Sequence, residues 1–179
     1  MSKIGKINIT IPEKVKVLLS GNNINIEGPQ GKKTLNIDLD IFDLNINDGK
    51  EVIIKPKKVD QNTKRLWGMN RSLINNAIIG ASTGYEKILE LTGVGFRASL
   101  KGKQLNLQLG FSHDINFDIP DGVKILVEKQ TIIKISGFDK QQVGMVSAEI
   151  KAMRPPEPYK GKGIKEQGQY ILRKEGKKK

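Results

Sequence analysis

The sequence predicts an α+β protein with two similar domains, each an antiparallel sheet packed with one helix, followed by a basic extended C-terminal tail. Short runs of alternating apolar and polar residues, with turn signals about every ten residues, indicate antiparallel strands rather than βαβ units. Each group of such runs leads into one stretch of helical period, and this order occurs twice. We therefore place the domains at 1–81 and 82–153 and the tail at 154–179.

The first half is predicted to contain short strands and then a helix. Alternation or β-branched content predicts strands over 7–11, 15–17, 23–27, 34–39 and 52–55. From Asp60 to Ile79 the apolar period becomes helical, and the predicted buried stripe is Leu66, Trp67, Leu73, Ile74, Ala77 and Ile78. Asp60 is the expected N-cap, and Gly80 is expected to end the helix.

The second half repeats this plan. It predicts strands over 87–91 and 115–119, and pairs of strands over 96–100 with 104–109 and 123–127 with 131–136. A helix is expected over 139–153, because Asp139 and Gln142 have the spacing of a capping box. Its predicted buried stripe is Val143, Val146, Ile150 and Met153.

The composition restricts the class of protein. With no cysteine, the chain has no disulfide framework, thiolate metal site or cysteine nucleophile. No apolar run approaches the ~18 residues of a membrane-spanning helix, and residues 1–6 lack the apolar region of a secretory signal. A pI of about 9.8 indicates a polyanionic partner, either nucleic acid or an anionic membrane surface.

The positive charge is segregated along the chain. Residues 151–179 hold ten Lys or Arg against three acids, which is +7 of the net +12, whereas residues 82–150 are neutral. Residues 154–163 read Arg-Pro-Pro-Glu-Pro-Tyr-Lys-Gly-Lys-Gly, which excludes helix and central strand. We expect this segment to have little core to join and to lie along a polyanion. Deleting 151–179 should then leave folded domains that no longer hold a polyanion such as RNA.

Candidate catalytic groups are few. Gly93 to Ala98 matches G-x-G-x-x-A, but a strand pattern rather than the required helix follows it. His113, the only histidine, could act with Ser112 and Asp114, although adjacent side chains point apart. Asp118 and Asp121 could form a carboxylate pair, but Pro-Asp-Gly is ordinary turn chemistry. We predict no enzyme activity, no cofactor and no metal.

Several motifs resemble those of one family over essentially the whole chain. They are Glu27-Gly28-Pro29-Gln30-Gly31, Gly93-Val94-Gly95-Phe96-Arg97-Ala98, Leu109-Gly110-Phe111-Ser112-His113, Gly137-Phe138-Asp139-Lys140-Gln141 and, most specifically, Arg154 to Ile164. The chain resembles the bacterial-type large-subunit ribosomal protein six family. It departs from the family pattern at Phe96 and Phe111, where tyrosine is common.

The resemblance implies a structural constituent of the large ribosomal subunit that binds ribosomal RNA near the sarcin–ricin loop and the factor-binding region. Its expected partners are that RNA and neighbouring ribosomal proteins, with no membrane and no small-molecule substrate. The expected location is the cytoplasmic ribosome of a bacterium, or an organellar ribosome if the chain is organelle-encoded. The implied RNA contacts, together with two further cations of the tail, are Lys151, Arg154, Tyr159, Lys160, Gly161, Lys162, Gly163, Lys165, Arg97, His113, Arg173 and Lys177.

Charge alone also permits a second function. A DNA- or RNA-binding module that works outside the ribosome would need the same basic surface. Sedimentation separates the two hypotheses, because a free factor would not travel with large subunits.

Overall fold

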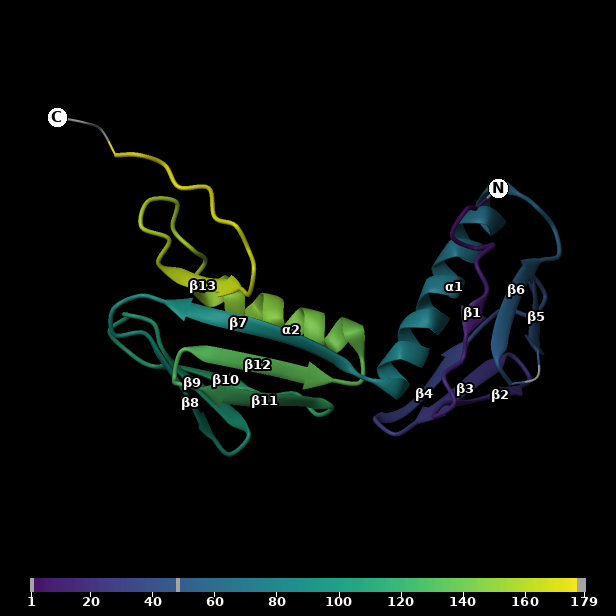
Figure 1. Ribbon diagram of the computed structural model, residues 1–179, viewed down its shortest axis with the longest axis horizontal. Helices are drawn as coiled ribbons and strands as arrows, with labels where there is room; N and C mark the ends of the chain where they lie inside the picture. The colour runs from purple at the N-terminus through teal and green to yellow at the C-terminus, as the bar shows by residue number, and fades with distance from the viewer. Residues whose placement is uncertain (1, 48, 177–179) are drawn as a thin grey trace. The chain divides into compact units, whose positions relative to one another are not determined.

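A computed structural model describes residues 2–47 and 49–176 (Figure 1). It contains two helices and several antiparallel sheets, which confirms the predicted α+β class. By its internal contacts the chain divides into two compact units, which are Met1–Gly84 with Phe138–Lys140 and Tyr85–Gly137 with Gln141–Lys179. Among residues 2–47 and 49–176, neither helix combines the length and the apolar composition that a membrane-spanning helix requires.

The first unit contains two three-stranded sheets. One has the order β2 (Lys16–Ser20), β3 (Asn23–Gly28) and β4 (Gly31–Asn36), and the other has the order β1 (Ile9–Thr10), β6 (Glu51–Pro56) and β5 (Phe42–Asn47). Alternation places Ile24 and Ile26 of β3 in the core, as the pattern predicts. Strand β5 was not predicted. Its Asp and Asn residues have low strand propensity, yet Phe42 is buried and pairs with Pro56.

Helix α1 (Gln61–Ser82) packs on β3, β4 and β6 through a buried face that includes Trp67, Ile74 and Ile78. The prediction that Gly80 ends the helix is wrong. Gly80 is buried inside the helix, which continues to Ser82 with Thr83 as its C-cap. Leu66 and Leu73, predicted on the buried stripe, are exposed. Asp60 is the N-cap in extended backbone geometry, but its side chain makes no capping hydrogen bond.

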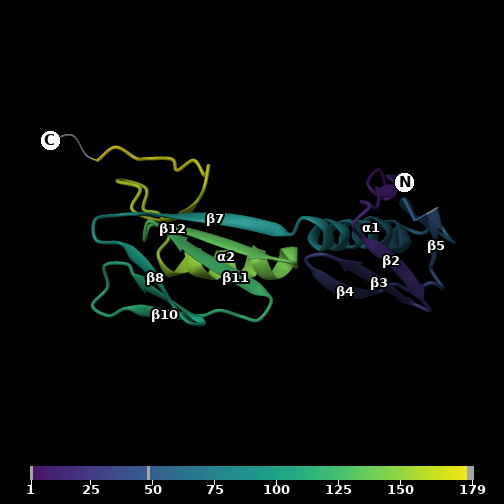
Figure 2. The same ribbon diagram turned by 60° about the horizontal axis from the view of Figure 1, so that its bottom comes forward.

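The second unit is built on a four-stranded sheet. Its order is β11 (Val123–Glu128), β12 (Ile132–Gly137), β7 (Tyr85–Thr92) and β13 (Gly163–Glu166). Helix α2 (Lys140–Met153) runs along β7 and β12 in both views (Figures 1 and 2). The predicted buried residues Val143, Val146 and Ile150 are confirmed in the core of this unit.

A three-stranded sheet completes the second unit. It has the order β10 (Ile115–Asp118), β9 (Gln104–Gln108) and β8 (Arg97–Lys101), which confirms the predicted hairpin between β8 and β9. Leu105 and Leu107 of β9 are fully buried. The buried Asn106 between them donates to Asn116 Oδ1 (2.8 Å), so its side chain is hydrogen-bonded inside the fold.

The C-terminal segment joins the core, contrary to the prediction. Residues 163–166 form β13, which pairs antiparallel with β7 and places Ile164 opposite Leu91. Ile164 has 0% of its surface exposed and belongs to the core of the second unit. The prediction failed because Pro and Gly lower strand propensity locally, whereas an edge strand tolerates them. Deleting residues 151–179 therefore removes part of a core as well as a basic surface.

Candidate nucleic-acid interface

Residues 154–162, here called the proline loop, form a closed turn between α2 and β13. The Ile164 N–H donates to the Arg154 carbonyl oxygen (2.8 Å), which closes the base of the loop. Inside it, the Glu157 N–H donates to the Lys162 carbonyl oxygen (2.9 Å) and the Gly161 N–H donates to that of Glu157 (3.1 Å). The loop therefore has a defined shape although it contains neither helix nor strand.

Two glycines allow this closure. Gly161 and Gly163 have φ values of +70° and +144°, which L side chains rarely adopt. A Cβ on Gly163 would lie 2.6 Å from Pro156 Cα, closer than the van der Waals radii of two carbons allow. Both glycines are buried, so the close backbone approach at Gly163 is to the proline loop itself.

The outer side of the proline loop carries exposed cations beside an aromatic ring. Lys160 and Lys162 are exposed, and Tyr159 has 58% of its surface accessible. The Lys174 N–H donates to the Pro158 carbonyl oxygen (2.8 Å), which brings the following segment against the loop. Arg173 lies beside Gly161, where an added Cβ would be 3.4 Å from the Arg173 Nε atom.

These residues form one basic surface, which we call the C-terminal surface and define as Tyr159, Lys160, Lys162, Arg173 and Lys174. Within residues 2–47 and 49–176, no acid forms an ion pair with any of its four cations. Their charge is therefore available to a partner. Lys177, also predicted as a contact, lies outside the described residues.

Two predicted contact residues are engaged within the protein. The Nζ atom of Lys165 lies 2.9 Å from Glu90 Oε2 on β7, and that of Lys151 lies 3.8 Å from Glu166 Oε1. Both lysine side chains are about 30% exposed. Their ammonium groups therefore balance carboxylates around β13, and a phosphate would have to compete with these partners.

A cation–π contact links the proline loop to the loop after β9. The Arg154 guanidinium carbon lies 4.8 Å from the centroid of the Phe111 ring. His113 is exposed two residues further along the same loop, and Arg97 is exposed at the start of β8. The fold thus brings Arg154 to the 110–113 loop. Over the described part of the chain, no ion pair or backbone hydrogen bond joins Arg97 or His113 to the C-terminal surface.

Phe111 and Lys174 belong to this region but were not predicted as contact residues. Phe111 stands out in the sequence only as a departure from a family pattern, and Lys174 only as part of the net charge. An aromatic residue in a polar loop was the available signal for Phe111. Nothing in the local sequence indicates that Lys174 returns to Pro158, since that hydrogen bond spans sixteen residues of chain.

The side chains that were considered as catalytic candidates do not come together in one site within the described residues. Asp114 Oδ2 accepts from the side-chain amides of Asn106 and Gln108, both at 3.3 Å. Asp118 accepts from Gln104 (2.7 Å) and Asp121 pairs with Lys103 (3.0 Å), so the two carboxylates have separate partners. Gly93 to Ala98 leads into β8 rather than a helix. Among the described residues, no group of three or more His, Asp or Glu could hold a metal ion.

Comparison with known proteins gives a partial match to one family model and full-length matches to individual proteins. Residues 92–167 match the family model described as Ribosomal protein L6. The chain is 48% identical over 179 residues to "Large ribosomal subunit protein uL6" of Beijerinckia indica, covering 100% of both chains. The protein of the same name is 47% identical in Sphingopyxis alaskensis and 46% identical in Caulobacter vibrioides, again over 100% of both chains.

Proposed function

Since this chain belongs to the ribosomal protein L6 family, we propose that it is a structural constituent of the large ribosomal subunit and binds ribosomal RNA through its C-terminal surface. The observation that carries this proposal is a group of four cations that form no ion pair with any acid of the described residues, namely Lys160, Lys162, Arg173 and Lys174. Such a group attracts a phosphate backbone and releases its condensed counterions.

The proposed recognition is by shape and charge. The major groove of A-form RNA is too deep and narrow for side chains to read its bases, so contacts fall on phosphates and riboses. Tyr159 is exposed beside Lys160 and offers a ring on which a base or ribose can stack. Arg154, held over Phe111, extends the cationic area toward the 110–113 loop.

The fold supports this role by holding the loop before RNA arrives. Three backbone hydrogen bonds and two buried glycines fix the proline loop, and β13 anchors its end to the sheet. A preformed loop loses little conformational entropy on binding, so more of the interaction energy contributes to affinity. Lys151 and Lys165 then act chiefly by stabilising β13.

The family resemblance supports a finer placement. We propose that the RNA in question lies near the sarcin–ricin loop and the factor-binding region, with neighbouring ribosomal proteins as further partners. Arg97 and His113 are proposed as additional contacts at the other loops of the second unit. A map of nucleotides crosslinked to Lys160 and Lys162 tests this placement directly, because crosslinks confined to other RNA regions would contradict it.

The RNA proposal is tested with a charge-matched pair of variants. Lys160→Gln with Lys162→Gln should lower affinity for large-subunit RNA and reduce the salt slope by about 1.8, since each phosphate that a lysine no longer neutralises changes the slope by about 0.9. The control, Lys101→Gln with Lys124→Gln, removes two exposed lysines elsewhere in the same unit. Equal effects from both pairs would contradict a specific C-terminal surface. Sedimentation with large subunits separates a ribosomal protein from a free nucleic-acid-binding factor.

A further inference from the structure

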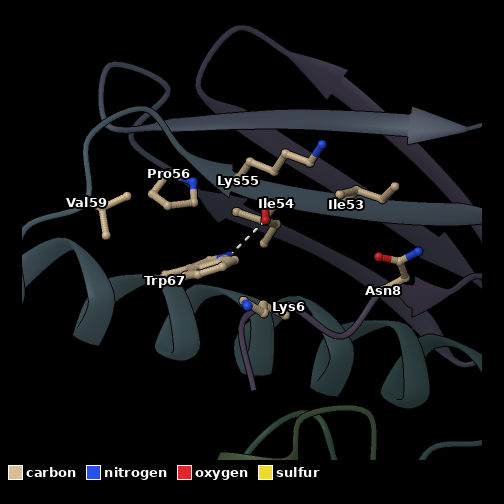
Figure 3. Close-up of a pocket in the computed structure, with 8 residues that line it drawn as sticks. All are labelled: Lys6, Asn8, Ile53, Ile54, Lys55, Pro56, Val59 and Trp67. Atoms are coloured by element: carbon tan, nitrogen blue, oxygen red, sulfur yellow. Dashed lines mark hydrogen bonds between the residues drawn. The ribbon is translucent and has the colours of Figure 1, made fainter. Parts of the chain in front are cut away.

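A pocket of about 470 Å³ lies in the first unit, between the N-terminal segment, the end of β6 and the first turns of α1 (Figure 3). Its walls are mostly apolar. They come from Ile53, Ile54, Pro56, Val59 and Trp67, and the remaining lining residues are Lys6, Asn8 and Lys55. This volume falls within the usual range for small-ligand sites, and its lining contains no acid.

The pocket is held by contacts within the unit. Trp67 Nε1 donates to the Ile54 carbonyl oxygen (2.8 Å), which fixes the indole against β6 (Figure 3). A Cβ on Gly5 would lie 2.5 Å from Trp67 Cδ2, so only glycine lets the N-terminal segment lie on the ring. Arg71 Nε donates to the Ile7 carbonyl oxygen (3.2 Å) and ties that segment to α1. The pocket is therefore preformed.

The stretches of sequence that form the pocket are strongly basic. Residues 55–71 contain six cations against the single acid Asp60, and residues 1–6 add two more cations. The eight are Lys3, Lys6, Lys55, Lys57, Lys58, Lys64, Arg65 and Arg71. Of these, only Lys57 forms an ion pair within the described residues, at 3.7 Å from Asp43. The rest of residues 1–81 is net negative, so the basic charge of this half belongs to these two stretches.

We propose that this pocket binds one unpaired nucleotide of an RNA chain, with the base against the apolar walls and the adjoining phosphates at Lys6 and Lys55. A nucleotide combines the two properties that the pocket accommodates, an apolar planar body and flanking negative charge. A purely apolar protein side chain would fill the walls but leave both ammonium groups unneutralised. The exposed Lys58 and Arg65, which form no ion pair within the described residues, hold further phosphates of the same strand.

The inference concerns a site on the first unit and does not depend on the C-terminal surface of the second. It therefore gives the protein two separate RNA-binding sites. Trp67, the only tryptophan, lines the pocket and reports on it alone. We expect binding confined to the C-terminal surface to leave this fluorescence unchanged, because Trp67 belongs to the first unit.

The test uses the full chain carrying Lys160→Gln and Lys162→Gln, so that the C-terminal surface is weakened. Decauridylate should change the Trp67 fluorescence on binding, whereas an abasic ribose-phosphate strand of equal length should not. Adding Lys6→Gln with Lys55→Gln should weaken decauridylate binding about tenfold, equivalent to ~1.4 kcal/mol, and lower the single-strand salt slope by about 1.4. The matched control is Lys14→Gln with Lys50→Gln, two exposed lysines of the same unit outside the pocket.

A second measurement does not rely on the fluorescence of Trp67. Ultraviolet crosslinking of a thiouridine-substituted strand should label peptides within residues 53–67, and Val59→Asp at the exposed edge of the pocket should abolish that label. The proposal is overturned if the labels fall only after residue 150, if the control pair weakens binding as much as the pocket pair, or if the abasic strand gives the same fluorescence change. If RNA bound at the pocket but not at the C-terminal surface, the proposed function would be contradicted and the inference about the pocket would stand.

Discussion

Lys165 and Glu90 are cross-strand partners in β13 and β7, and the Nζ and Oε2 atoms of their side chains lie 2.9 Å apart. A lysine of the basic C-terminal segment thus helps to hold that segment to the sheet. Because both side chains are about 30% exposed, water screens much of the attraction. A double-mutant cycle with Lys165→Gln and Glu90→Gln should give a coupling of about 0.5 kcal/mol in urea denaturation. Lys165→Gln should lower the affinity for RNA less than Lys160→Gln does. Equal losses of affinity in the two variants would identify Lys165 as a direct contact.

Ile164 should matter to stability far more than its place near the end of the chain suggests. Its side chain is fully buried in the core of the second unit. Ile164→Ala should lower the free energy of unfolding by about 3 kcal/mol, because it removes buried apolar surface and leaves a cavity. The control is Leu172→Ala, which trims a side chain that is 71% exposed and should change stability by less than about 0.5 kcal/mol. Equal small effects would show that β13 is not docked in solution.

The sequence predicted both described helices and every described strand except β5 and β13, because the apolar residues of those elements repeat with a clear period. Ile24 and Ile26 alternate within one hairpin, and Val143, Val146 and Ile150 repeat at helical spacing, so period alone identifies their buried face. The helical period of apolar residues does not determine which side of a wide apolar stripe packs against the sheet. For this reason Leu66 and Leu73 were predicted in the core although they are exposed.

Strand β13 could not be predicted in the same way. Its pairing partner β7 lies about seventy residues earlier, and the flanking Pro and Gly residues favour irregular structure locally. The same limit applies to the candidate site. Composition identified the basic segment. Only the fold shows that Lys151 pairs with Glu166 and Lys165 with Glu90, whereas Lys160 and Lys162 form no ion pair within the described residues.

Gly163 tests whether the shape of the proline loop matters. Gly163→Ala would combine an unfavourable φ of +144° with an approach of 2.6 Å to Pro156 Cα, so we expect stability to fall by about 2–4 kcal/mol. RNA affinity should fall as well, because the loop must open to relieve the clash. Gly176→Ala is the control, since a Cβ there meets nothing within 4 Å. A stable variant with unchanged affinity would contradict the proposed preformed loop.

A truncation should separate charge from folding. Ending the chain after Gln169 keeps β13 and the bond from the Glu166 N–H to Gln169 Oε1 (3.3 Å), but removes five cations, which are Arg173, Lys174, Lys177, Lys178 and Lys179. This variant should unfold at nearly the same urea concentration as the full chain and bind large-subunit RNA about tenfold more weakly. Deletion of 151–179 should instead destabilise the second unit, because it removes Ile164 from the core. Undiminished affinity after the short truncation would exclude Arg173 and Lys174 from the interface.

The Arg154–Phe111 pair gives a prediction about the positioning of a cation. Phe111→Leu keeps an apolar side chain but removes the ring beneath the guanidinium, whose carbon lies 4.8 Å from its centroid. The cation–π contribution at an exposed site is about 0.5–1 kcal/mol, so stability should change little while Arg154 loses its fixed orientation. If Arg154 binds phosphate, Phe111→Leu should weaken RNA binding less than Arg154→Gln, and the two changes should be less than additive in a binding cycle. Strict additivity would mean that Phe111 contacts RNA independently of Arg154. If neither substitution changed RNA affinity, the 110–113 loop would not be part of the interface.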